Sequence, residues 1–193
     1  MSDWRACKNF LAEKPNADGA AAVLLTRRDL LPSKLPHPLV KISGSAASSD
    51  TLALHDRHDL LEFSAAKDST EQALKKAGQT LSEIQFFEYH DHFSIYAALS
   101  LEAAGFASRG EGWRLAADGS ITHAGRIPCA TMGGLKARGF PGGATGVYQA
   151  AEAVTQLRGE ADSSIQINGA KVGMIQSLGG PASTAVTHIL ERI

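Results

Sequence analysis

Cysteine is scarce in this sequence, which has two, Cys7 and Cys129, in 193 residues. Two thiols cannot build a disulfide framework, so the composition fits a reducing compartment and a fold that depends on its hydrophobic core. Long apolar runs are also missing, because no stretch approaches the ~20 apolar residues that a membrane-spanning helix needs. Residues 1–5 carry no apolar signal region. These absences predict a cytoplasmic protein with no membrane partner.

An excess of charge of either sign is missing too. The formal net charge is -1, which gives no electrostatic reason to expect nucleic acid as a partner. Hydrophobic residues make up 44% and charged residues 20% of the chain, the balance of an ordinary globular protein. The length suits one compact domain with a substantial core.

Apolar periodicity predicts strands that alternate with helices. A turn cluster from Pro15 to Gly19 separates an amino-terminal helix or arm from the rest, and residues 107–126 are polar and predict a surface excursion. Strands are expected at residues 20–25, 39–42, 84–87, 171–176 and 184–190, and helices at 64–77, 93–104 and 147–157, closed by Gly78, Gly105 and Gly159 respectively. This order predicts an α/β layered domain with a mixed sheet.

The run from Tyr89 to Phe93 places two histidines just after an expected strand. If the chain is still extended there, His90 and His92 face the same side. Imidazoles titrate near neutral pH and could transfer protons. They could also begin a metal site, but no third ligand stands at a convincing spacing, so we expect no metal. Considered alone, two polar histidines that cap the next helix remain the simplest interpretation.

Two glycine-rich turns could present backbone N–H groups to a ligand. The turn from Gly139 to Gly146 lacks the ending of a Walker A loop, and it either contacts an anion or carbonyl oxygen or lets a strand meet a helix closely. The turn from Ser177 to Gly180 either forms an oxyanion hole or is a plain hairpin turn. Neither motif is decisive alone.

The order of four motifs carries a resemblance. The series Asp18-Gly19-Ala20-Ala21-Ala22-Val23, His90-Asp91-His92-Phe93, the fourteen residues from Gly133 to Gly146, and Leu178-Gly179-Gly180 resembles that of thiolases of the archaeal and sterol-carrier-protein branch. The resemblance implies the carboxyl-terminal half of that fold, a five-stranded mixed sheet with helices on both faces. Residues 39–193 would form this domain. Residues 1–38 would be an arm, a remnant of the first half with its last strand at 20–25, and a connector.

By the same resemblance, the family's site is altered in this chain. His90 matches a histidine that positions a water or donates to a thioester oxygen, and His92 stands where this branch carries its acid/base cysteine. Phe140 replaces the histidine that activates the nucleophile, and a phenyl ring cannot exchange a proton. Ser177 stands where other thiolases carry an acid/base cysteine. Gly179 matches the glycine whose N–H points at the thioester oxygen.

The resemblance also bears on coenzyme A and on the nucleophile. Ser43, Gly142 and Gly143 fall near the expected contacts with coenzyme A. The family's nucleophilic cysteine belongs to the first half, and neither Cys7 nor Cys129 stands in a matching context. Cys129 is more simply interpreted as an ordinary buried thiol.

These correspondences imply a subunit that acts on acyl-CoA thioesters, by acyl transfer or by retro-aldol or Claisen-type carbon–carbon cleavage. A partner polypeptide would supply the missing first half, and we expect a homo- or hetero-oligomer because a lone half would expose an apolar face. The coenzyme A thioester is expected as substrate, with no tightly bound cofactor. The alternatives are a non-catalytic coenzyme A-binding or assembly subunit, or an incomplete thiolase chain that is inactive alone.

Overall fold

The computed structural model describes residues 16–193, so the expected amino-terminal arm and Cys7 lie outside the described residues. Its centre is a mixed sheet with the strand order β1-β4-β3-β2. β2 runs parallel to β3, and the other neighbours are antiparallel. The strands are β1 (Val40–Ser49), β2 (Phe87–Glu88), β3 (Val172–Gly179) and β4 (Thr184–Arg192).

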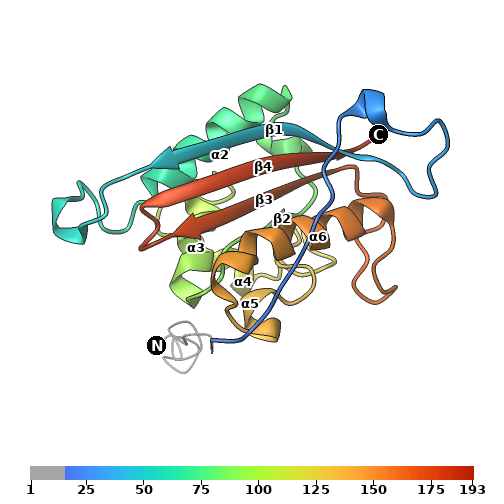
Figure 1. Cartoon of the computed structure of the whole chain (residues 1–193). Helices are drawn as coiled ribbons and strands as arrows, with labels where there is room; N and C mark the ends of the chain where they lie inside the picture. Colours follow the sequence, from blue (N-terminus) through green and yellow to red (C-terminus); the bar gives the residue numbers. More distant parts are fainter. Residues whose placement is uncertain (1–15) are drawn as a thin grey trace.

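Helices cover both faces of this sheet (Figure 1). The longer ones are α2 (Ser64–Ala77), α3 (Ser94–Ala103) and α6 (Thr145–Arg158), and the shorter ones are α4 (Arg114–Ala117) and α5 (Gly134–Arg138). Single 3-10 turns are η1 (Arg28–Leu30), η2 (Leu54–Asp56), η3 (Leu81–Glu83) and η4 (Gly142–Ala144). The three long helices confirm the predicted ones. Gly78 and Gly159 end α2 and α6 in the left-handed conformation that glycine adopts without strain.

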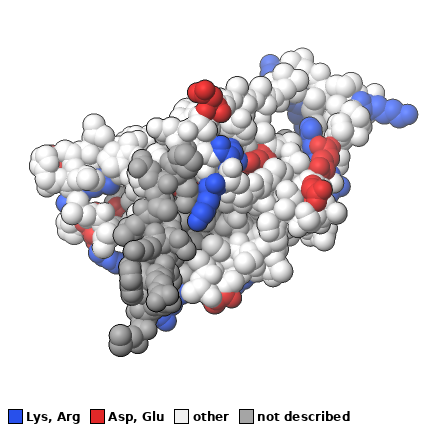
Figure 2. Space-filling model, turned by 90° about the horizontal axis from the view of Figure 1, so that it is seen from below, with Lys and Arg blue, Asp and Glu red and all other residues white. Residues whose placement is uncertain are grey.

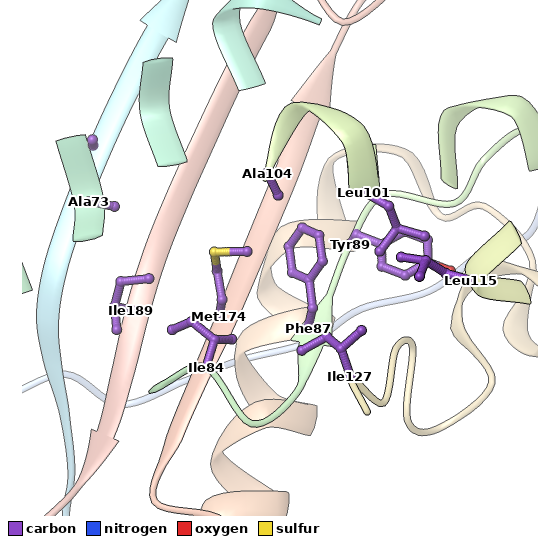
Figure 3. Packing of buried hydrophobic residues seen from close by; sticks show 11 residues of the cluster. Ala73, Ile84, Phe87, Tyr89, Leu101, Ala104, Leu115, Ile127, Met174 and Ile189 are labelled. Carbon is purple, nitrogen blue, oxygen red and sulfur yellow. The ribbon is translucent and has the colours of Figure 1, made fainter. Parts of the chain in front are cut away.

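Alternate residues of β3 supply the two halves of the core. Met174 packs with Phe87, Ile189 and Ala73 on the α2 side, where Figure 3 shows these side chains close together. Ile175, the next residue, belongs to a second cluster on the α6 side. The period of two along β3 therefore buries both faces of the sheet.

The sheet has four strands in the described chain, not the five that the resemblance implied. A fifth segment does run beside β2, because the amide of Phe87 donates to Pro128 O at 2.8 Å and Ala130 N donates to Phe87 O at 3.1 Å. Only one bridge forms, between Phe87 and Cys129. Pro128 has no N–H to extend the ladder, and the positive φ of 46° at Ala130 turns the chain away.

The strand expected at residues 20–25 is not formed. Val23, Leu24 and Leu25 are 42%, 95% and 70% exposed, and the segment crosses in front of α6 in Figure 1 without joining the sheet. A strand needs a neighbour for its backbone groups, and no described strand lies beside this one. Residues 16–38 are therefore an extended strap, held at one end by a bridge between Asn16 and Phe140.

β1 is longer than expected, because the strand predicted at residues 39–42 continues to Ser49. The small side chains of residues 43–49 allow α2 to lie directly on the strand. A Cβ atom on Gly44 would stand only 2.1 Å from the carbonyl oxygen of Ala73, so only glycine fits there.

Candidate functional site

The chain that leaves the carboxyl end of β2 brings His90 to the level of Ser177 in β3. The strands are parallel, and Phe87 pairs with Met174 and Glu88 with Ile175. Continued by two residues, this register places His90 level with Ser177, on the face covered by α6. Ligands of α/β sheets bind at this edge of the strands.

Phe140 lies against both histidines. Its ring stacks on the imidazole of His92 with 3.9 Å between ring centroids, and it meets His90 edge-on at 5.5 Å. The opposite face of His92 stacks on Phe93 at 4.4 Å. The imidazole of His92 is thus held between two phenyl rings, and the centroid of His90 lies 6.2 Å away.

Two ring nitrogens at this site have no hydrogen-bond partner within residues 16–193, namely Nδ1 of His90 and Nε2 of His92. His90 is 6% exposed, and this burial, with the nearby His92, lowers its pKa from 6.5 to about 4. At neutral pH it is therefore a neutral imidazole, which can accept one hydrogen bond and donate another. A buried polar atom without a partner is costly, and a substrate atom would satisfy it.

Asp91 points to the other side and ties this strand end to α5. Its Oδ1 accepts a hydrogen bond from the amide of Leu135 at 2.9 Å. Gly134 stands so close that a Cβ atom there would lie 2.6 Å from Oδ2 of Asp91, and its φ is 58°. Glycine at position 134 is therefore needed for this close approach.

Ser177 faces the first turn of α6. A Cβ atom on Gly146 would lie 3.3 Å from the Oγ of Ser177, so the glycine lets the helix approach the serine closely. Gly179 is exposed at the end of β3, opposite Thr184. Gly142 and Gly143 form the turn before α6, and a Cβ on either would meet nothing within 4 Å. Their backbone thus borders open space close to Phe140.

Two sequence candidates lie apart from this group. Ser43 is in β1, two strands from β3, and its hydroxyl donates to Ile189 O at 3.1 Å. The structure does not bring it to the histidines, because β4 lies between β1 and β3. The thiol of Cys129 donates to Ile127 O, and burial raises its pKa well above the usual value. It is therefore a poor nucleophile, since the thiolate is the reactive form.

Sequence reasoning missed a network of buried charged groups next to the site. Glu88 is 1% exposed, and its Oε1 accepts hydrogen bonds from the amide of Thr131 at 2.9 Å and from its hydroxyl at 2.5 Å. Arg138 forms an ion pair with Glu152 on α6. The one signal in the sequence was the acidic residue Glu88 within an apolar strand, which calls for a partner.

Burial raises the pKa of Glu88 to about 7. The hydrogen bonds from Thr131 act in the opposite direction, and the negative charge of Glu152 adds to the increase. Burial also raises the pKa of Glu152, which Arg138 counteracts. Two buried carboxyl groups therefore lie near one guanidinium, and a pKa of about 7 leaves Glu88 partly protonated near neutral pH.

The mixed sheet, the helices on its two faces and the histidines at the ends of β2 and β3 define the class of protein as the carboxyl-terminal half of a thiolase-type fold. Residues 46–192 match the thiolase C-terminal domain-like family, and the chain belongs to it.

Among curated proteins, the chain is 46% identical to the acetyl-CoA acetyltransferase of Methanothermobacter thermautotrophicus, over 92% of the chain and 46% of that protein. It is 33% identical to sterol carrier protein 2 of Homo sapiens, over 90% of the chain and 32% of that protein. Among solved structures, the Ltp2-ChsH2(DUF35) aldolase superimposes with a TM-score of 0.72 at 28% identity, over 81% of this chain and 40% of that one. The chain spans half or less of the length of these relatives.

None of the described helices is long and apolar enough to cross a bilayer. The face shown in Figure 2 carries acidic and basic side chains singly or in small groups, separated by uncharged surface. This pattern gives a polyanion no extended basic surface to bind on that face.

Proposed function

We propose that this chain is a thiolase-like subunit that acts on acyl-CoA thioesters together with a partner polypeptide. The partner supplies the first half of the fold and the groups that this half lacks. One observation carries the proposal: His90 and His92 stand at the ends of parallel strands, with unpaired ring nitrogens, against the residue that replaces the family's histidine.

Proton transfer in this site falls to the histidines. Phe140 cannot exchange a proton, whereas His90 is a neutral imidazole at pH 7 and His92 lies beside it. His92 is the acid/base of the proposal because it occupies the place of the branch's acid/base cysteine. His90 donates a hydrogen bond to the thioester oxygen or positions a water.

Carbon–carbon cleavage of a β-hydroxyacyl-CoA fits this arrangement. His92 takes the proton of the hydroxyl group, the carbonyl of the departing aldehyde or ketone forms, and the bond between the α and β carbons breaks. Its electron pair passes to the thioester as an enolate, which His90 and the backbone of Gly179 stabilise before it is protonated. The similarity to a structure named as an aldolase supports this reaction over thiolysis. Thiolysis would also need a base that activates the partner's nucleophilic thiol, and Phe140 cannot act as one.

The thioester itself is bound by backbone groups, and no tightly held cofactor is required. Gly142 and Gly143 border open space at the start of α6, where their N–H groups can meet polar atoms of coenzyme A. This contact does not depend on side chains and therefore tolerates the replacement at position 140.

A partner chain, or a second copy of this chain, covers the apolar strap. Leu24, Leu25 and Leu30 are 95%, 70% and 69% exposed, more apolar surface than a short segment normally leaves in water. The relatives are at least twice as long as the matched region, which supports a separate first half. Sedimentation of the purified chain tests this expectation, and a stable monomer that recruits no other polypeptide would count against it.

A non-catalytic role is the second candidate, and the replacement at position 140 favours it. A half that has lost its activating histidine could still bind coenzyme A through its glycine-rich turns and organise an assembly. This candidate predicts that His90 and His92 can be changed without loss of the complex's activity.

The deciding experiment purifies the native complex and assays it with an acyl-CoA, a 3-ketoacyl-CoA and a β-hydroxyacyl-CoA. The proposal expects turnover of the β-hydroxyacyl-CoA that depends on His92. If only the 3-ketoacyl-CoA is cleaved, by thiolysis, the reaction is acyl transfer and not retro-aldol cleavage. Turnover that is unchanged by His92→Ala would support the non-catalytic candidate.

A further inference from the structure

The position of Phe140 depends on a short loop between two helices. α5 ends at Arg138 and α6 begins at Thr145, so residues 139–144 connect them. Gly139 has a φ of 80°, a conformation that ends α5 and turns the chain into the loop. Whatever fixes the two ends of this loop also fixes the ring that covers His92.

Arg138 fixes one end of the loop to α6. Its guanidinium forms an ion pair with Glu152, and the two side chains are only 18% and 10% exposed. The same guanidinium lies over the ring of Tyr148, 5.0 Å from its centroid. Both contacts are to α6, so one side chain spans the loop that carries Phe140. A half-buried ion pair with a cation–π contact holds its geometry better than an exposed pair does.

The strap holds the same loop from the other side. The amide of Ala17 donates to Phe140 O at 3.1 Å. A Cβ on Gly19 would lie 3.0 Å from Pro141 and 3.1 Å from the hydroxyl of Tyr148, so the strap lies directly on the ring that Arg138 contacts. Tyr148 therefore contacts both the guanidinium and the strap.

We propose that Arg138 is a positioning residue that holds Phe140 in its stack over His92. The inference rests on the proposed function only in taking that stack as part of the site. Loss of the guanidinium leaves Glu152 buried near Glu88 and Asp91 with no cation beside it. Removal of one partner of a buried pair is destabilising. We expect the two ends of the loop that carries Phe140 to move in response.

The test follows the ring signals of His92 by NMR in the full chain, whose mass is 20.3 kDa. Stacking between two phenyl rings shifts these signals from the positions of an exposed histidine. Arg138→Gln is expected to reduce this shift to the part that Phe93 causes, whereas the signals of His188 in β4 stay in place. The matched control is Arg114→Gln, which removes an exposed ion pair with Glu111 and should move neither histidine.

Two further variants keep the result decisive if Arg138→Gln folds poorly. Glu152→Gln keeps the shape of its side chain and should shift the His92 signals in the same direction by a smaller amount. Arg138→Lys keeps the charge and should restore the position of His92 in part. His92 signals that are unchanged in every folded variant would overturn the proposal. Because this measurement needs no turnover, it can fail or succeed independently of the assay of acyl-CoA chemistry.

Discussion

The ring of Phe140 lies over the imidazole of His92 with 3.9 Å between centroids and 26° between planes. By the resemblance, a histidine is expected at position 140, where this chain has a phenyl ring that cannot exchange a proton. The ring contacts two ionisable groups, the imidazoles of His90 and His92.

His92→Ala should lower the activity of the native complex by about 10²–10⁴-fold, the usual contribution of a general acid or base. The assay is turnover of β-hydroxyacyl-CoA at saturating substrate. The matched control is His55→Ala, because His55 lies in η2 with its side chain 84% exposed and takes no part in the site. Equal activity of the two variants would contradict a catalytic role of His92 and support the non-catalytic candidate.

Phe140→Ala should raise the pKa of His90 from about 4 towards its ordinary value of 6.5. Burial is the main cause of the low value, and Phe140 supplies part of that burial at 5.5 Å. With water admitted, the charged form of His90 is no longer penalised. An NMR titration of the histidine signals measures the change. His188, whose pKa burial also lowers, is the internal reference and should not respond. A pKa of His90 that stays near 4 in this variant would show that residues other than Phe140 exclude water from His90.

The sequence predicted the helices of this fold better than its strands. α2 and α6 carry their own signals, an apolar face with the period of a helix and a glycine at the end, and such signals are local. The segment 20–25 reads as a buried strand but has no neighbour in the described chain. β1 was expected only at residues 39–42 but pairs with β4 from Val40 to Ser49, with a register shift between Ile42 and Gly44. A strand depends on partners far away in the sequence, so its local pattern is a weaker guide.

The candidate site was predictable in part for the same reason. His90, Ser177 and the glycines before α6 were chosen as candidates because the resemblance fixed their order, and the register of β2 and β3, continued by two residues, places His90 level with Ser177. Glu88 and Arg138 were missed because their role depends on burial, which no local pattern of charged residues reveals. Ser43 was placed at the site by position in the chain alone, and two strand widths separate it from β3.

Gly173→Ala should destabilise the chain by about 1–3 kcal/mol, the usual cost of overpacking a core. A Cβ at this position of β3 would lie 2.2 Å from the ring of Phe86, which is itself fully buried. The control is Gly143→Ala, because a Cβ there meets nothing within 4 Å, and its stability should match that of the native chain. Urea unfolding monitored by circular dichroism measures both. Equal midpoints would mean that the Phe86 ring can move aside at no cost.

Glu88→Gln should make the chain more stable at alkaline pH. The pKa of Glu88 is raised from 4.5 to about 7 in the folded state, so the unfolded chain releases this proton at a lower pH than the folded one. Stability from this group therefore falls as pH rises from about 4.5 to about 7, by up to about 3 kcal/mol, and stays lower above that. Glutamine can still accept the hydrogen bonds of Thr131 and has no proton to lose.

Urea unfolding of the native chain and of Glu88→Gln between pH 4 and pH 8.5 tests this prediction. The two proteins should be similar at pH 4 and diverge in favour of the variant above pH 7. Glu83→Gln is the matched control, because a hydrogen bond from the backbone of Thr80 lowers the pKa of Glu83, the opposite sign. That variant loses a bond to a carboxylate and should gain no stability in alkali. If the native chain and Glu88→Gln show parallel pH profiles, burial does not raise the pKa of Glu88 in the folded protein, and the prediction is wrong.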